Sequence, residues 1–153
     1  MSEPERLDQL QGYIRAEEHL QALAALLRPD FAFVPALRNA VPYDGPDGKP
    51  SELANVEINY VLERSDSDPD ATREQLYELN SSVFTRVEEL WLGEGYEVIT
   101  RTVDQPHRVL RVKDPGDEFV MSLKQGTRGN LWVTSSSAPV RRTGVKPPPP
   151  VLS

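Results

Sequence analysis

The sequence contains no cysteine and only two histidines, His19 and His107. Without thiols there is no disulfide framework, no thiolate zinc site and no cysteine nucleophile. The histidines do not form a His-x-x-x-His motif, and a metal site built from them would need carboxylates nearby. We expect both to be exposed, His19 on a polar stretch of the first helix and His107 at a turn. We therefore expect neither a metal nor a cofactor.

Catalytic motifs are also missing. Neither glycine pattern of a phosphate-binding loop, G-x-x-x-x-G-K or G-x-G-x-x-G, occurs. The serines at 135–137 are not in a Gly-x-Ser-x-Gly elbow. We therefore expect no enzymatic activity. The alternative, a small hydrolase, would need carboxylates that converge in a pocket, and the candidates for these are Asp44, Asp47, Glu57 and Asp114.

No stretch of the chain approaches the roughly 18 apolar residues of a membrane-spanning helix. The first residues are charged from position 3 and lack the apolar segment of a secretory leader. These absences predict a cytoplasmic protein without a membrane span, unless a leader has been removed.

The 153 residues suit a single domain, and 38% hydrophobic with 27% charged residues is a globular composition. The net charge of −7 is unevenly distributed. Residues 1–104 hold nine Lys and Arg against 21 Asp and Glu, whereas residues 105–153 hold eight against three. Net acidity argues against sequence-independent DNA binding, which needs dense positive charge. The basic half is compatible with a local anionic partner.

Two helices are predicted. The first begins at a capping box formed by Ser2 and Glu5 and ends at Arg28-Pro29, with apolar residues at helical spacing. Its expected buried stripe is Leu7, Leu10, Ile14, Leu20, Leu23 and Leu27. The second helix spans about 69–92, with Asp68 as N-cap. Its expected stripe is Leu76, Leu79, Val83, Val87, Leu90 and Trp91.

Five strands are predicted. Residues 53–63 alternate between apolar and polar side chains, and four short strands follow at about 96–103, 107–113, 118–124 and 131–136. Their short, turn-rich separators indicate antiparallel hairpins. Residues 30–50 are predicted to be a Pro/Gly-rich loop. The expected fold is α+β with two layers: an N-terminal helix, then β-α-β-β-β-β, with helices covering one face of a mainly antiparallel sheet.

We place a single domain at residues 1–140 and a Pro-rich tail at 141–153. Four consecutive prolines at 147–150 favour a polyproline II conformation. Such an end is typically disordered or linker-like. The alternative is a ligand for an aromatic-lined groove.

Strand alternation also predicts a candidate binding surface. If Leu110, Met121 and Val133 face the core, the outer face of the sheet carries Arg111, Lys113, Lys124 and Trp132. An exposed tryptophan among cations is typical of a protein-binding surface. Single-stranded nucleic acid could use the same stacking and charge. Alternatively, the tail or the 30–50 loop covers Trp132 and the cations are merely solvated.

Residues 83–140 show a helix ending near Trp91 and Gly93, then GYEV, a hairpin at DPGDEFVMSL, and GNLWVTSSSAPV. This layout resembles the C-terminal part of small actinobacterial putative lipoproteins of unknown function, which end in a "dpdGf-x-v-x-L … G-x-L-x-l-x-s-S-P-C" pattern. Here Ala138-Pro139-Val140 stands where that family has its cysteine, and no lipobox is visible. The resemblance implies a fold and an actinobacterial or actinophage source, but no functional residue.

The function we predict is a non-enzymatic protein-interaction domain that uses its sheet face or its acidic helices. One form is an immunity-type protein that neutralises a toxin, which would favour a basic partner. A structural component of a phage or secretion assembly is an alternative, as is the small hydrolase. A protein partner is expected, nucleic acid is not favoured, and the oligomeric state is left open.

Overall fold

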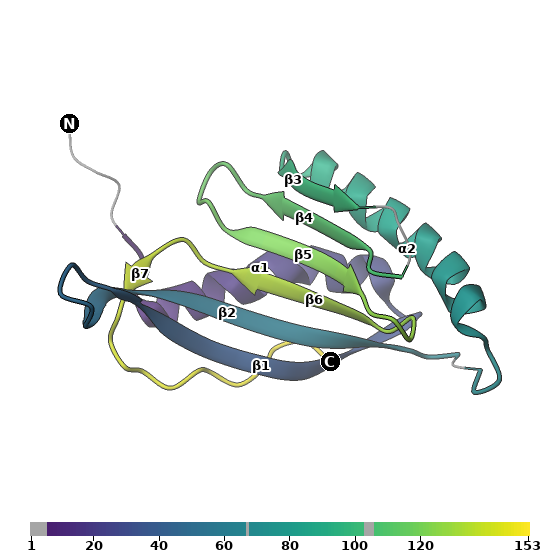
Figure 1. Cartoon of the computed structure of the whole chain (residues 1–153), viewed down its shortest axis with the longest axis horizontal. Helices are drawn as coiled ribbons and strands as arrows, with labels where there is room; N and C mark the ends of the chain where they lie inside the picture. Colours follow the sequence, from purple (N-terminus) through teal and green to yellow (C-terminus); the bar gives the residue numbers. More distant parts are fainter. Residues whose placement is uncertain (1–5, 67, 103–105) are drawn as a thin grey trace.

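The computed structural model describes residues 6–66, 68–102 and 106–153, and it shows an α+β fold with helices packed against a mainly antiparallel sheet (Figure 1). Among these residues, no helix is both long enough and apolar enough to cross a membrane. The elements are α1 (Gln9–Leu27), β1 (Phe31–Asp44), β2 (Pro50–Arg64), α2 (Arg73–Gly93), β3 (Glu97–Thr102), β4 (Val109–Lys113), β5 (Val120–Gln125), β6 (Leu131–Ser136) and β7 (Val140–Arg141).

The sheet has the strand order β1-β2-β6-β5-β4-β3, with β7 paired to β2. All of these pairs are antiparallel. Helix α2 carries the chain from β2 to β3 at the opposite edge, and the β3–β6 meander then returns to pair with β2. Figure 1 shows both helices on the same side of the sheet. The predicted fold class and the five predicted strands are confirmed, within a few residues at each end.

One predicted loop is a strand. Residues 31–44 form β1, although we expected a Pro/Gly-rich loop over 30–50. β1 is an edge strand that pairs only with β2, and its register shifts between Pro35 and Arg38 and again between Pro42 and Asp44. Proline is tolerated at edges and bulges because its missing N–H interrupts no central ladder there. The turn chemistry is confined to residues 45–49.

Both helices begin later than predicted. Asp8 caps α1, accepting from the Gln11 N–H while the Gln11 side chain accepts from the Asp8 N–H. The predicted capping residues, Ser2 and Glu5, lie outside the described residues. Thr72 caps α2 in the same way, whereas Asp68 accepts from the Asp70 N–H in a turn. Each true cap has a glutamine three residues later that completes a capping box.

The buried face of α1 also differs from the predicted stripe. Leu10 and Ile14 are exposed, while Tyr13 and Ala16 are buried against the sheet. Three polar residues share the buried face, namely Gln9, Glu17 and His19. On α2, Leu79 is exposed in the same manner, and the buried positions are Asn80, Val83, Phe84, Val87 and Trp91. The helices therefore contribute polar groups to the interior, and these groups must find partners there.

The tail is packed on the domain rather than extending from it as a linker. Arg141 belongs to β7, which pairs with β2. The Gln9 side chain binds the backbone of residues 143–145, and Leu152 is buried in the hydrophobic core. Figure 1 shows the tail, in yellow, running back from β7 along the domain, and its end binds Tyr60 of β2 and Arg28. A disordered end is therefore not what the structure shows.

Gly129, in the β5–β6 turn, packs closely against Leu76 of α2. Its φ is +80°, and a Cβ atom there would lie 2.6 Å from the Leu76 Cβ. We expect Gly129→Ala to lower the free energy of unfolding by about 2 kcal/mol, from the left-handed backbone and the clash together. Gly48, with φ +77° and open surroundings, is the matched control, and its alanine variant should lose only about 1 kcal/mol. Urea denaturation measures both, and equal losses would contradict the role of the Leu76 contact.

Candidate functional site

In the part of the chain that the structure describes, one face of the sheet has no helix on it (Figure 1). α1 contacts β2 and β6, and α2 contacts β4, on the side where alternate strand residues are fully buried. The side chains pointing to that side include Val56, Ile58, Leu110, Val112, Met121, Leu123 and Val133. Their sequence neighbours point to the opposite side, which we call the open face.

The open face carries all four predicted binding residues, but not as one compact cluster. Trp132 is half-buried and lies opposite Lys124 on β5 and Val61 on β2. Lys124 pairs with Val109 on β4, and Arg111 lies two positions after Val109 on the same strand. Arg111 and Lys124 are therefore diagonal neighbours on the open face. Lys113 lies one further pair along β4. The predicted orientation of these residues is confirmed, whereas their binding role stays a prediction.

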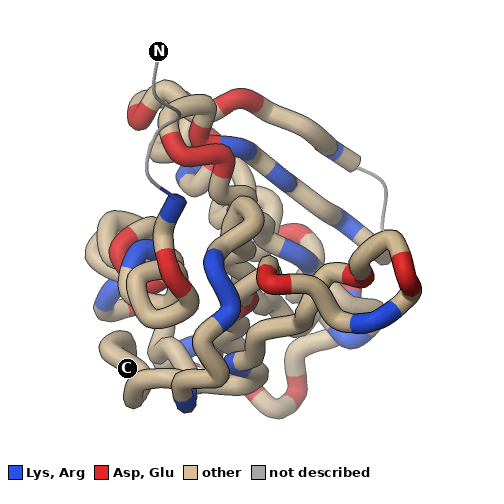
Figure 2. Tube along the Cα trace, turned by 90° about the vertical axis from the view of Figure 1, so that its left-hand side faces the viewer, with Lys and Arg blue, Asp and Glu red and all other residues tan. Residues whose placement is uncertain are grey.

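The cations of the open face differ in their partners. Lys113 pairs with Glu118, Nζ to Oε1 3.4 Å, and lies opposite Glu97 on β3. Within the described ranges, Arg111 and Lys124 make no ion pair. Figure 2 shows Lys and Arg positions spaced along strands, and Asp and Glu positions on helices and strands as well as at turns. Of the four predicted residues, Lys124 therefore offers a cation without an ion pair to the described residues directly opposite Trp132, and Arg111 lies one diagonal step further.

Trp132 also has apolar neighbours on the open face. Val61, which lies opposite Trp132, is 37% exposed, and Val61 in turn pairs with Val34 of β1. Neither segment that we considered as a cover for Trp132 lies over it. Residues 31–44 extend the sheet sideways as β1, and the tail ends at Tyr60, whose side chain is buried on the helix side. The open face therefore combines an apolar stripe with Lys124 and Arg111, which make no ion pair to the residues that the structure describes.

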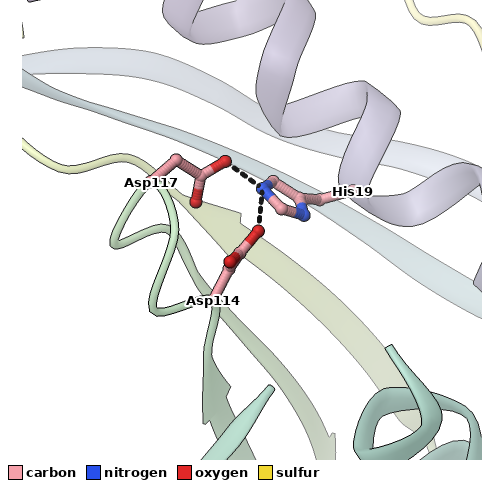
Figure 3. Close-up of side chains that lie close together, drawn as sticks. All are labelled: His19, Asp114 and Asp117. Atoms are coloured by element: carbon pink, nitrogen blue, oxygen red, sulfur yellow. Dashed lines mark hydrogen bonds and ion pairs between the residues drawn. The ribbon is translucent and has the colours of Figure 1, made fainter. Parts of the chain in front are cut away.

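A second polar cluster lies between α1 and the β4–β5 turn (Figure 3). His19 is buried, with its side chain 1% exposed, which corrects the expectation of an exposed histidine. Its Nε2 lies 2.7 Å from Asp117 Oδ2 and 3.7 Å from Asp114 Oδ2, and its Nδ1 lies 3.0 Å from the Tyr96 hydroxyl. His107, by contrast, is exposed as predicted.

Arg15 completes this cluster from the solvent side. Its Nε donates to Asp117 Oδ2 at 2.8 Å, and its Nη2 lies 3.7 Å from Asp114 Oδ2. Burial alone would raise the pKa of Asp117, but hydrogen bonds from the Phe119 N–H, Arg15 and His19 outweigh it and lower that pKa. Burial raises the pKa of Tyr96, aided by the nearby Asp114 carboxylate, so its hydroxyl keeps its proton. Asp117 is therefore a charged acceptor for two cationic or polar donors.

The ligand atoms of His19, Asp114 and Asp117 lie within 4.8 Å of one another, a spacing that a metal ion could use. The surroundings do not fit one. The Arg15 guanidinium already lies against both carboxylates, and a dication would have to displace that positive charge. The arrangement is instead that of a buried hydrogen-bond network that joins α1 to the β4–β5 turn.

An open cleft of about 960 Å³ lies beside this network. It is lined by Arg6, Leu7, Arg15, residues 114–119 and Ala138-Pro139-Val140. The carboxylates that we proposed for a hydrolase do not converge in it. Asp44 and Asp47 are exposed near the β1–β2 turn, Glu57 lies on the open face, and only Asp114 reaches the cleft. The structure therefore does not bring the four predicted carboxylates together.

Sequence reasoning missed the His19 network for an identifiable reason. Asp117 lies 98 residues from His19 along the chain, so no local spacing connects them. A signal was nevertheless present on α1. Gly12, Ala16, His19 and Leu23 follow 4-3-4 spacing and are all buried, which places His19 on the core face.

Comparisons with protein-family models, with curated proteins and with solved structures gave no match for this chain.

Proposed function

We propose that this protein is a non-enzymatic interaction domain that binds a protein partner through the open face of its sheet. One observation carries the proposal: in the described part of the chain, the helices cover one face of the sheet. The other face holds Trp132 opposite Lys124, with Arg111 one diagonal step further, and neither cation has an ion pair there. The partner surface that fits combines an apolar centre with carboxylates.

The energetics favour Trp132 as the centre of such a contact. Large aromatic residues supply much of the binding energy of protein interfaces when a partner completes their burial. Its neighbour Val61 adds apolar area, and the cations at Lys124 and Arg111 would steer an acidic partner toward the face. Burying a cation without a partner is costly, so the two cations also disfavour partners that lack carboxylates.

An immunity-type role and a role as an assembly component both use such a surface, and they differ in the partner. The immunity-type role with a basic toxin would require the acidic helices to make the contact. The open face instead favours an acidic partner. Single-stranded nucleic acid fits less well, because stacking along a strand needs several aromatic residues in a charged groove, whereas the predicted binding surface is centred on Trp132 alone.

Trp132→Ala tests this proposal. Affinity capture from the organism that encodes the chain, read by quantitative mass spectrometry, should return an acidic partner with the wild-type protein. The amount of partner captured by the variant should fall at least about ten-fold. Truncating a central aromatic residue typically weakens the binding free energy by about 2 kcal/mol or more. Leu79→Ala, an exposed position on α2, is the matched control and should capture the partner normally. Circular dichroism confirms that both variants are folded.

Charge reversal gives a second readout on the purified pair. Lys124→Glu should slow association and reduce its dependence on ionic strength, whereas Lys49→Glu, at the exposed β1–β2 turn, should change neither. A partner that is captured equally by the wild-type protein and by Trp132→Ala would refute the proposal.

A further inference from the structure

The tail contacts the domain at two separate points, and the first is strongly held. The buried Gln9 side chain accepts from the N–H groups of Thr143 and Gly144, at 3.0 and 3.2 Å, and donates to the Val145 carbonyl at 3.1 Å. These bonds, with the pairing of Arg141 in β7, tie the start of the tail to α1 and β2. The tail therefore leaves the domain from a defined position.

The middle of the tail makes no hydrogen bond to the described part of the domain. Residues 146–151 are exposed, except for half-buried Pro148. The four prolines lack N–H donors and favour an extended polyproline II arm with a rise of about 3.1 Å per residue. This arm joins the first contact point to residue 152 without a hydrogen bond to the described part of the domain.

The second contact point depends mainly on one side chain. Leu152 is 7% exposed and belongs to the hydrophobic core. Its N–H donates to the Tyr60 hydroxyl at 3.4 Å, and Arg28 Nη2 donates to the Ser153 carbonyl at 3.3 Å, both long hydrogen bonds. We call this place, bounded by Tyr60 and Arg28, the Leu152 site. Burial of one leucine favours the bound tail by roughly ten- to hundred-fold, so roughly 1–10% of molecules have it open.

Arg38, a charged residue near the Leu152 site, has two side-chain nitrogen atoms without an acceptor among the described residues. The Tyr60 hydroxyl, which accepts from Leu152, is 3.3 Å from Arg38 Nη1. The Arg38 side chain is only 9% exposed, and its Nε and Nη2 are buried without an acceptor among the described residues. The tail presents an aliphatic side chain to this region and leaves those two donors unpaired.

We propose that the Leu152 site binds an extended proline-rich segment of another protein, and that the tail of the chain itself is an intramolecular competitor for that segment. The chemistry of the ligand follows from the segment already bound there: a polyproline II arm that ends in an aliphatic residue. The tail can compete and be displaced because the burial of one leucine supplies most of its binding free energy, so a ligand needs few additional contacts to replace it. A hydrogen-bond acceptor on the ligand that reaches the Nε or Nη2 of Arg38 would be such a contact.

The test uses the full chain and a fluorescently labelled peptide with the sequence of residues 145–153, followed by fluorescence anisotropy. Leu152→Ala in the chain weakens the internal competitor, so this variant should bind the peptide at least about ten-fold more tightly than the wild type, in the millimolar range or better. Val151→Ala is the matched control, since Val151 is 63% exposed, and it should match the wild type. A peptide with alanine at the Leu152 position should bind neither chain.

A second measurement needs no variant. Excess peptide added to the wild-type chain should accelerate hydrogen exchange at the Leu152 amide at least about two-fold and leave the Val133 amide of β6 unchanged. Equal affinity of the peptide for the wild type and Leu152→Ala, or no acceleration, overturns the proposal. A wild-type dimer in light scattering that becomes monomeric in Leu152→Ala would also overturn it, because the tail would then exchange between two copies of this chain.

Discussion

Glu17→Gln should lower the free energy of unfolding by about 3 to 5 kcal/mol, because it leaves a buried guanidinium without its counter-charge. Glu17 Oε1 lies 2.5 Å from Arg38 Nη1, and the Tyr60 hydroxyl donates to the same carboxylate at 2.7 Å. Both charged side chains are over nine-tenths buried. The substitution removes the negative charge and keeps the positive one, so the interior then holds a single unbalanced charge. Urea or thermal denaturation measures the loss.

The neighbouring Glu18 supplies the control for this experiment. Glu18 is about half exposed and lies 3.7 Å from Arg15, so Glu18→Gln should change stability by less than about 1 kcal/mol. The double variant Glu17→Leu with Arg38→Met should recover most of the stability, because an apolar pair avoids the cost of burying two charges. A double variant as unstable as Glu17→Gln would mean that packing rather than charge explains the loss.

Asp117→Asn should lower the free energy of unfolding by about 3 kcal/mol near neutral pH, since hydrogen bonds to a charged group are lost at two partners. Asp117 Oδ2 accepts from Arg15 and lies 2.7 Å from the Nε2 of buried His19. Asp114 provides the control inside the same cluster. Its Oδ2 reaches His19 and Arg15 only at 3.7 Å, so Asp114→Asn should cost less than about 1 kcal/mol.

The Asp117 contribution should also depend on pH. The pKa of Asp117 in the folded protein lies below its ordinary value of 3.8, so the folded state favours the carboxylate. The stability that this carboxylate provides is fully present above 3.8 and is lost as the pH falls through the lowered pKa. The gap between the wild type and Asp117→Asn should therefore be constant from about pH 7 to about pH 5 and narrow toward about pH 3. A gap that widens in acid would contradict this assignment.

Prediction from the sequence succeeded where a pattern is local. The alternation of residues 53–63 and of the four later strands predicted the strands, their inward faces and the positions of Trp132 and Lys124 on the outer face. The same alternation could not identify β1, because Pro35 and Pro42 are signals for a loop unless the strand is known to lie at an edge. Whether a strand lies at an edge depends on the whole sheet. β1 is an edge strand because, in the described structure, it pairs with β2 alone.

Buried polar groups were harder to predict for the same reason. Glu17 and His19 are polar residues on a helix, and their sequence context is typical of a solvated surface. Their burial becomes favourable only because Arg38, Tyr60 and Asp117 arrive from β1, β2 and the β4–β5 turn. The helical spacing of α1 could place His19 on the core face, but partners distant in sequence carry no local signal, so neither the contacts of His19 nor the burial of Leu152 was predicted.

The sequence by itself determined an acidic, cysteine-free chain with an α+β fold, a mainly antiparallel sheet, and a tryptophan placed among basic residues on one strand face. Only the tertiary structure decided which face of the sheet is left open and that the proline-rich tail is held at Leu152. It also decided that Lys113 has an ion pair with Glu118, whereas Lys124 and Arg111 have none among the described residues. The physical reason is that alternation sets the side of a strand on which a residue lies. What covers that side depends on segments brought together only when the chain folds.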